Sequence, residues 1–146
     1  HEDPRRQRQM CIRDRVHGGG ATHRMRLDDA ILIKDNHLKL SKNIKKSIEI
    51  SRSKYPNLMV EVEADNEQQA IEIAKNGADR VMLDNFSPDE ATATIRKLRE
   101  ISDIEIEISG GVTIENIASY AKKADFISLG SLTMSSLPVD FSLHVL

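Results

Sequence analysis

Residues able to do chemistry recur at regular spacing along this chain of 146 residues. Glu63, Asp84, Ser109 and Gly130 are separated by 21, 25 and 21 residues, and each ends a short apolar run. Lys34 ends an earlier run of the same kind. Carboxylates can share a Mg²⁺ ion, and a lysine that faces a site either binds an anion or forms a Schiff base. The spacing therefore predicts a site assembled from the ends of several strands.

Two of the acidic residues need a partner of opposite charge. Glu61 and Glu63 alternate with valines, so both lie on one face of the predicted strand. A parallel sheet is normally covered on both faces, and burying two unpaired carboxylates is costly. We therefore expect a cation beside them, which Lys34, Mg²⁺ or both would provide. Asp84, at the end of the next strand, is placed to share it.

The glycines predict a phosphate site. Gly110 and Gly111 follow one strand and precede a helix expected from Thr113, so backbone N–H groups are exposed at a positive helix end. Gly130 and Ser131 form a second turn of this kind after the next strand. Phosphate sites in βα barrels often use the last two strand-end loops.

A further pair of cationic side chains precedes the first strand. His23 and Arg24 follow the triple glycine at 18–20, which lets the backbone approach a ligand closely. Such donors suit planar carboxylates.

The elements that position these residues alternate regularly between strand and helix. Strands are predicted over 31–33, 58–63, 80–84, 104–108 and 125–129, and helices over 40–54, 66–76, 87–100 and 113–122, with a short helix from 131. This βα repeat predicts an α/β fold whose parallel strands form an incomplete TIM-like barrel. An open, doubly wound sheet is the alternative, but its site gathers at a single switch point rather than at every strand end.

Composition excludes several other classes of protein. A single cysteine, Cys11, rules out a disulfide framework and a cysteine-based zinc cage. No apolar run approaches the ~20 residues of a membrane span, and no secretory signal is present, so we expect a cytoplasmic protein without a membrane partner. Residues 1–16 are basic and show no period, which predicts a disordered or non-native arm. No aromatic residue lies among its arginines, so nucleic acid is not an expected partner.

Several sequence motifs, in order along the chain, resemble those of the type II phosphoribosyltransferases, in particular quinolinate phosphoribosyltransferase. They are Gly-Gly-Gly-Ala-Thr-His-Arg at 18–24, Leu-Ile-Lys-Asp-Asn-His at 32–37, Val-Glu-Val-Glu at 60–63, Gly-Ala-Asp at 77–79, Met-Leu-Asp-Asn-Phe at 82–86, Ser-Gly-Gly-Val-Thr at 109–113 and the run at 125–133. The resemblance covers residues 17–146 almost continuously.

The resemblance implies a transferase of NAD biosynthesis. In that reaction quinolinate takes a phosphoribosyl group from phosphoribosyl pyrophosphate, with Mg²⁺, and gives nicotinate mononucleotide, CO₂ and pyrophosphate. Carried over motif by motif, His23, Arg24 and Lys34 would meet the quinolinate carboxylates, and Glu63 and Asp84 would hold the ribose hydroxyls and the metal-bound donor. Lys34, Glu63 and Asp84 are thus the expected catalytic residues. The 5-phosphate pocket would be lined by Ser109, Gly110, Gly111, Gly130, Ser131 and Leu132.

The chain also departs from the family's pattern. Residues 1–16 stand where the family has an Arg-Lys-Thr segment and an amino-terminal domain, and Met134 stands where some members have a histidine. We therefore expect residues 17–146 to be the carboxyl-terminal barrel of a longer enzyme, a homodimer or higher oligomer, with little turnover on its own. The alternatives are a relative associated with molybdenum transport, a barrel lyase using Lys34 as a Schiff base, and a non-catalytic binding fragment.

Overall fold

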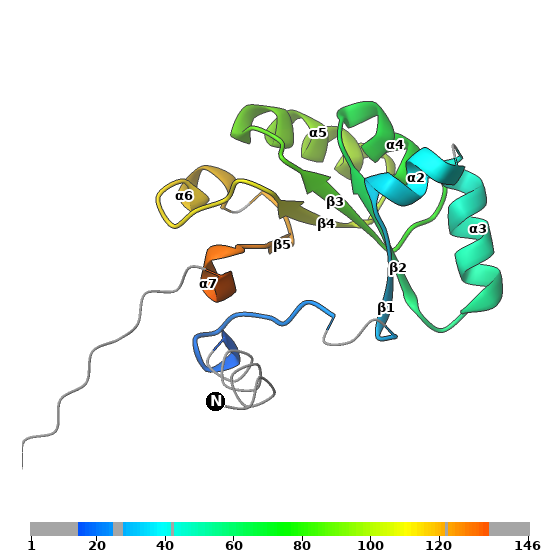
Figure 1. The fold of residues 1–146 in the computed structure, drawn as a ribbon. Helices are drawn as coiled ribbons and strands as arrows, with labels where there is room; N and C mark the ends of the chain where they lie inside the picture. The colour runs from blue at the N-terminus through cyan, green and yellow to red at the C-terminus, as the bar shows by residue number, and fades with distance from the viewer. Residues whose placement is uncertain (1–14, 25–27, 42, 122, 135–146) are drawn as a thin grey trace, which may run out of the picture.

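The computed structural model describes residues 15–24, 28–41, 43–121 and 123–134. Strands and helices alternate along them (Figure 1). In chain order the elements are β1 (Ala30–Ile33), α2 (Asp35–Ser41), α3 (Ile44–Lys54), β2 (Met59–Ala64), α4 (Glu67–Lys75), β3 (Arg80–Asp84), α5 (Pro88–Ile101), β4 (Glu105–Ser109), α6 (Ile117–Tyr120), β5 (Phe126–Ile127) and α7 (Ser131–Met134).

The five strands form one parallel sheet in the order β1-β2-β3-β4-β5. Each strand pairs with the strand that precedes it in the sequence, as in a barrel. In a doubly wound sheet the order of the strands would instead reverse once, at the switch point. The predicted α/β fold of parallel βα repeats is therefore confirmed. In the described part of the chain the sheet is open, with β1 and β5 at its edges, so it is an arc and not a closed barrel.

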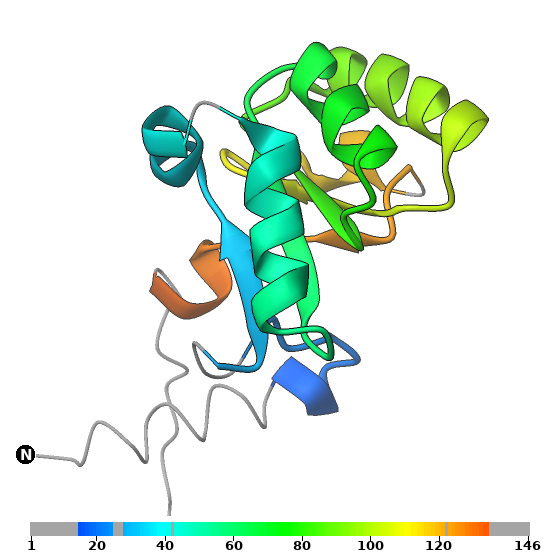
Figure 2. The same cartoon turned by 90° about the vertical axis from the view of Figure 1, so that its right-hand side faces the viewer.

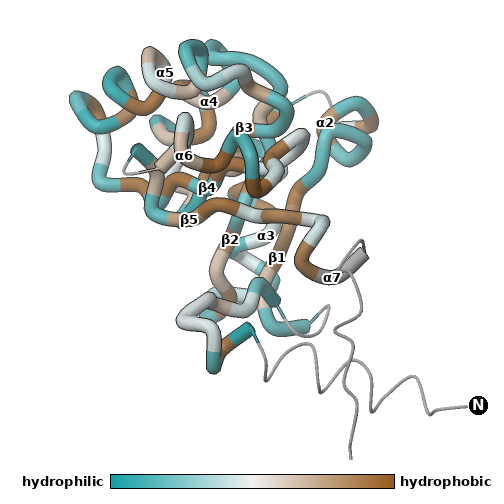
Figure 3. The backbone as a smooth tube through the Cα atoms, turned by 90° about the vertical axis from the view of Figure 1, so that its left-hand side faces the viewer, coloured by the Kyte–Doolittle hydropathy of each residue, from teal (hydrophilic) through white to brown (hydrophobic). Residues whose placement is uncertain are grey.

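The two faces of the sheet differ in character. Helices α3, α4 and α5 lie along one face (Figures 1 and 2), and the strand residues that point toward them are apolar and buried. The brown strands of Figure 3 show this apolar layer. Each fully buried apolar side chain between the sheet and these helices contributes roughly 1.5–3 kcal/mol to the free energy of folding. These side chains, from strands and helices together, include Ile48, Val60, Val62, Ile73, Val81, Leu83, Leu98, Ile106 and Ile108. The alternate strand residues point to the other face, where the Arg15–His23 segment and α7 lie.

One aspartate contact occurs twice and fixes where strands begin. Asp79, just before β3, accepts a hydrogen bond of 2.7 Å from the backbone N–H of Val60 and pairs with Arg52 of α3 at 2.8 Å. Asp125, just before β5, accepts one of 2.7 Å from the N–H of Ile106 and pairs with an arginine of α5 at 2.6 Å. Each contact ties a strand start to its neighbouring strand and to a helix. The same contact therefore fixes the start of β3 relative to β2 and the start of β5 relative to β4.

Most predicted helices are present with the predicted ends. Ser87 and Glu90 form a capping box at the start of α5, and Gly77 follows α4 with φ of 76°. The helix predicted over 40–54 is present and ends at Lys54 as predicted, but it starts only at Ile44, because α2 and α3 are separate and the side chain of Asn43 caps the second one.

Two elements near the carboxyl terminus are shorter than predicted. The helix predicted over 113–122 covers only Ile117–Tyr120, since the N–H of Thr113 donates to Oδ1 of Asn116 at 2.8 Å and closes a turn instead. The strand predicted over 125–129 is limited to the two residues of β5.

The basic arm predicted over residues 1–16 falls almost wholly outside the described residues. Its last two residues, Arg15 and Val16, form a helical turn that continues to His17. The N–H groups of Gly19 and Gly20 donate to the carbonyls of Val16 and Arg15, at 3.0 and 2.9 Å, and close this turn.

Candidate active site

The predicted strand-end residues lie along one rim of the sheet. Lys34 follows β1, Glu63 lies near the end of β2, and Asp84 and Ser109 are the last residues of β3 and β4. Asp84 and Ser109 are paired in register across the two strands. Because all strands are parallel and adjacent, these carboxyl ends share one edge, as the spacing predicts.

The Ser109–Gly111 turn requires its glycines. Gly110 and Gly111 have φ of 79° and 63°, a region that L-residues adopt only at a cost. Asn85, which also has a positive φ of 58°, donates its backbone N–H to the carbonyl of Ser109 at 2.9 Å. A Cβ on Gly110 would lie 2.7 Å from that same backbone nitrogen. The turn after β4 and the turn after β3 are therefore packed directly against each other.

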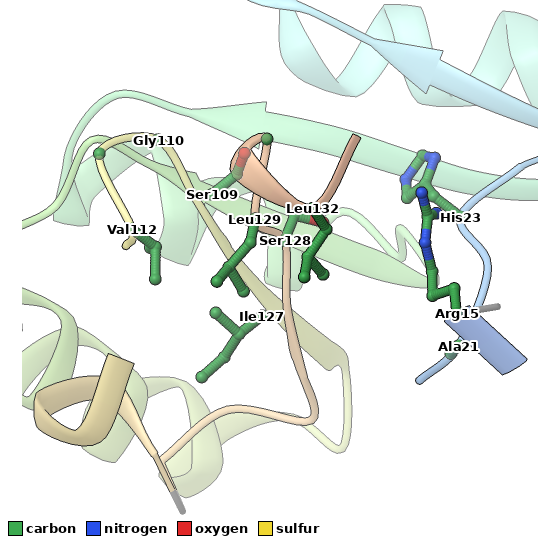
Figure 4. A pocket seen from close by; sticks show the side chains of 12 residues that line it. Arg15, Ala21, His23, Ser109, Gly110, Val112, Ile127, Ser128, Leu129 and Leu132 are labelled. Carbon is green, nitrogen blue, oxygen red and sulfur yellow. The ribbon is translucent and has the colours of Figure 1, made fainter. Parts of the chain in front are cut away.

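A pocket of about 480 Å³ opens beside this turn. Figure 4 shows Arg15, Ala21 and His23 on one side of it, and on the other side the last residues of β4 and β5 with the residues that follow them. Its lining residues are Arg15, Ala21, His23, Ser109, Gly110, Gly111, Val112, Ile127, Ser128, Leu129, Gly130 and Leu132. Five of the six residues predicted to hold the 5-phosphate are among them. Ser131 is the exception: its Oγ is buried and has no hydrogen-bond partner in the described part of the chain.

Glu63 and Asp84 form a pair of carboxylates next to the pocket. Burial, and then the negative charge of Asp84, raise the pKa of Glu63, while the charge of Lys34 acts in the opposite direction. Oδ2 of Asp84 accepts a hydrogen bond of 2.6 Å from the side chain of Asn85. Among the described residues no donor lies within hydrogen-bonding distance of the Glu63 carboxylate. Oxygen atoms of these two carboxylates are therefore available as ligands for a divalent cation.

A second acidic cluster lies on the same face of the sheet, and the sequence analysis predicts only part of it. Nε2 of His23 lies 2.9 Å from Oε2 of Glu61 and 3.8 Å from Oε2 of Glu107. Both glutamates are buried, and the pKa of His23 is raised, chiefly by its hydrogen bond to Glu61. Arg80 approaches Glu107 at 3.4 Å and pairs more closely with Glu105 at 2.7 Å. His23 therefore lies beside Glu61, where a cation is expected, whereas Lys34 is exposed.

Glu107 is a residue that sequence reasoning missed. Glu105 and Glu107 alternate with Ile106 and Ile108, the same pattern that singled out Glu61 and Glu63. That alternation could have identified Glu107 as a buried acid, since β2 and β4 belong to the same parallel sheet.

The three residues that the resemblance assigns to the quinolinate carboxylates are not equivalent in the structure. His23 lines the pocket, whereas Arg24 and Lys34 do not. Lys34 is exposed, and its backbone N–H donates to Nδ1 of His37 at 3.0 Å. The side chain of Met134, which stands in place of a histidine, lies outside what the structure describes.

The chain is similar to known proteins over most of its length. Residues 9–144 match the family described as quinolinate phosphoribosyl transferase, C-terminal domain, so the match begins before the boundary predicted at residue 17. A probable nicotinate-nucleotide pyrophosphorylase [carboxylating] of Archaeoglobus fulgidus is 40% identical over 133 residues, which are 88% of this chain and 51% of that protein. The human nicotinate-nucleotide pyrophosphorylase [carboxylating] is 38% identical over 132 residues, 88% of this chain and 44% of the relative.

Solved structures give the same result. NadC from Streptococcus pyogenes superposes with a TM-score of 0.87 at 36% identity, covering 96% of this chain and 49% of that one. The nicotinate-nucleotide pyrophosphorylase from Francisella tularensis gives a TM-score of 0.74 at 37% identity, with 80% and 41% covered. A thiamine phosphate pyrophosphorylase from Pyrococcus furiosus, at 18% identity and a TM-score of 0.55, shares the fold.

The chain spans about half the length of the curated relatives it matches. No helix in the described part of the chain combines the length and the apolar composition that crossing a membrane requires. From the family match over residues 9–144 and the agreement in fold, the chain belongs to the quinolinate phosphoribosyl transferase family, as its C-terminal domain.

Proposed function

We propose that this chain provides the barrel half of an enzyme that moves a phosphoribosyl group from phosphoribosyl pyrophosphate to quinolinate. The products are nicotinate mononucleotide, CO₂ and pyrophosphate. The observation that carries the proposal is the register pairing of Asp84 with Ser109. It puts the carboxylate pair next to a glycine-lined pocket, so one ligand can place its ribose at the acids and its 5-phosphate in the pocket.

The parts of the site have complementary charges for such a ligand. Backbone N–H groups of the Ser109–Gly111 turn would bind the 5-phosphate, because peptide N–H groups in left-handed turns make a small anion-binding concavity. His23 would meet a carboxylate of quinolinate, with Arg24 and Lys34 as the further cations. Glu63 and Asp84 would bind the ribose hydroxyls and hold Mg²⁺. When bound, Mg²⁺ would neutralise the pyrophosphate as it leaves.

Lys34 has a different role from a Schiff-base lysine. Such lysines are activated by desolvation in an apolar pocket or by a second cation, whereas the side chain of Lys34 is exposed. In this proposal its fixed positive charge stabilises the negative charge that develops as the 2-carboxylate is lost.

The proposal includes an assembly and a compartment. The residues that complete the quinolinate pocket are assigned by the resemblance to the half of the relatives that this chain does not match. We therefore propose that the whole enzyme is a cytoplasmic homodimer or higher oligomer and that these 146 residues alone turn over slowly. Closing the site against water strengthens every electrostatic contact within it, and the open arc of strands gives no such closure.

Binding of nicotinate mononucleotide to the chain tests the proposal directly. Calorimetric titration is expected to show binding of the nucleotide and much weaker binding of nicotinate riboside, which lacks the phosphate. Ala21→Asp adds a negative charge to the exposed wall of the pocket and is expected to weaken nucleotide binding about tenfold or more.

Ala121→Asp is the matched control, since Ala121 is also exposed but lies outside the pocket. Equal affinity for the riboside and the nucleotide would contradict the assignment of the pocket to the 5-phosphate. Equal effects of the two substitutions would contradict it as well.

A further inference from the structure

The His23, Glu61 and Glu107 cluster has a charge balance that the proposed reaction does not explain. Glu61 is fully buried, and its only partner in the described part of the chain is Nε2 of His23, at 2.9 Å. Its second oxygen, Oε1, has no hydrogen-bond partner there. A carboxylate buried in this position stays ionised only beside a positive charge and otherwise takes up a proton.

The carboxylate of Glu107 has more partners than that of Glu61, but these partners do not neutralise the charge of Glu61. The hydroxyl of Ser128 donates to its Oε1 at 2.6 Å, and Arg80 approaches its Oε2 at 3.4 Å. Arg80 is shared with Glu105, and its guanidinium also lies 4.0 Å from the centre of the Phe126 ring. One cation therefore faces two buried carboxylates, and a protonated His23 provides the second.

The hydrogen bond to Glu61 also decides what the other ring nitrogen can do. Nε2 of His23 is committed to Glu61, which accepts and cannot donate when ionised. In a neutral ring Nδ1 would then be an acceptor and would repel an anion. In an imidazolium Nδ1 carries a proton and is a donor. No hydrogen bond to Nδ1 is formed within the described residues, and His23 lines the pocket beside Ser109 and Gly110.

We propose that Glu61 and Glu107 are positioning residues that hold His23 as an imidazolium, with its Nδ1–H as the donor to an anionic ligand in the adjoining pocket. Neither glutamate touches the ligand; both act through His23. The charged groups facing the ring are Glu61 of β2, Arg80 of β3, Glu107 of β4 and Arg15 on the pocket wall. The two carboxylates raise the pKa of His23, against burial and Arg80, which lower it.

The same three side chains could in principle hold a metal ion, since their ligand atoms lie within 4.8 Å of one another. The contacts favour the proton. Nε2 of His23 already lies at hydrogen-bond distance, 2.9 Å, from Oε2 of Glu61, and the positive charge of Arg80 next to Glu107 disfavours a divalent cation there.

The test measures the pKa of His23 by NMR in the whole chain with labelled histidines. It is expected to lie above 6.5, and Glu61→Gln should lower it by about 1 or more, because glutamine keeps an acceptor oxygen but removes the charge. Glu63→Gln, two residues further along the same face, is the matched control and should leave His23 unchanged. His37, whose ring accepts from the backbone of Lys34, serves as an internal reference in each spectrum.

The same histidine resonances also report whether His23 binds an anionic ligand. Inorganic phosphate and quinolinate are each titrated at several pH values, and the affinity of a bound anion should fall as the pH rises through the pKa of His23. In Glu61→Gln that fall should occur at lower pH, with about tenfold weaker binding for each pKa unit lost at pH values above the wild-type pKa of His23. Glu107→Gln should shift it in the same direction, which keeps the test informative should Glu61→Gln fail to fold.

Four results would each overturn the inference. They are a His23 pKa at or below 6.5, equal effects of Glu61→Gln and Glu63→Gln, stoichiometric binding of Zn²⁺ by the three side chains, and an Nδ1 resonance that neither anion perturbs. The ligand class rests on the proposed function, but the two can fail separately: phosphate that binds at His23, in a chain that binds nicotinate mononucleotide no better than nicotinate riboside, would support this inference and contradict the proposed function.

Discussion

Replacing Gly110 by alanine tests whether the two strand-end turns are held together as the structure shows. Gly110 has φ of 79°, and a Cβ there would lie 2.7 Å from the backbone nitrogen of Asn85, with Oδ1 of Asn85 also in close contact. The left-handed conformation alone costs an L-residue about 1–2 kcal/mol. Overpacking against atoms that cannot easily move adds about 1–3 kcal/mol. We therefore expect Gly110→Ala to lower the free energy of unfolding by roughly 2–5 kcal/mol.

Gly111→Ala provides the matched comparison. Gly111 has a similar φ of 63°, but a Cβ there would meet no atom within 4 Å. Only the conformational cost of about 1–2 kcal/mol is expected for it. Urea unfolding followed by circular dichroism measures both variants under the same conditions. If Gly110→Ala were no less stable than Gly111→Ala, the close packing of the turns after β3 and β4 would be wrong, and with it the neighbouring placement of acids and pocket.

Two further predictions concern aspartates. The pKa of Asp125 is lowered, since its contacts with Arg99 and the N–H of Ile106 outweigh the burial that opposes them. These contacts therefore stabilise the folded chain above pH 3.8, and this stabilisation is lost as the pH falls below that value. In urea unfolding, the advantage of the wild-type chain over Asp125→Asn should shrink from about pH 6 to about pH 3, and a constant difference would contradict this contact. Asp84→Asn should bring the pKa of Glu63 down toward its ordinary value of 4.5, as measured by NMR of the carboxyl carbons. An unchanged pKa of Glu63 would mean that the two carboxylates do not interact.

Much of the fold could be predicted from local patterns. The period of about 21 to 25 residues between strand-end polar residues reflects one strand, one helix and two loops, and the structure confirms the resulting parallel sheet. Helix ends with side-chain caps, such as Ser87 and Asn66, were also predictable, because capping is decided by nearby residues. The predicted start at Thr113 failed because the side chains of Thr113 and Asn116 each accept a hydrogen bond from the other's backbone N–H, which closes a turn in place of the first helical turn.

The partner of the buried acids could not be predicted, because it depends on contacts between distant parts of the chain. His23 lies 38 residues from Glu61 in sequence and reaches it only after β2 and β4 pair on either side of β3. Alternation in the sequence indicates that Glu61 is buried and needs a cation, but several cations satisfy that requirement equally. Only the folded sheet selects His23 and Arg80, and leaves Lys34 exposed at the rim.

The central claim is that this rim transfers a phosphoribosyl group to quinolinate with loss of its 2-carboxylate. The most direct measurement is release of labelled CO₂ from 2-carboxyl-labelled quinolinate, with phosphoribosyl pyrophosphate and Mg²⁺, by this chain joined to the half of the Archaeoglobus fulgidus relative that it does not match. We expect CO₂ and nicotinate mononucleotide in equal amounts, and loss of both when Glu63→Gln and Asp84→Asn are introduced together. A folded hybrid that binds nicotinate mononucleotide but releases no CO₂, or one that is unaffected by the two substitutions, would contradict it.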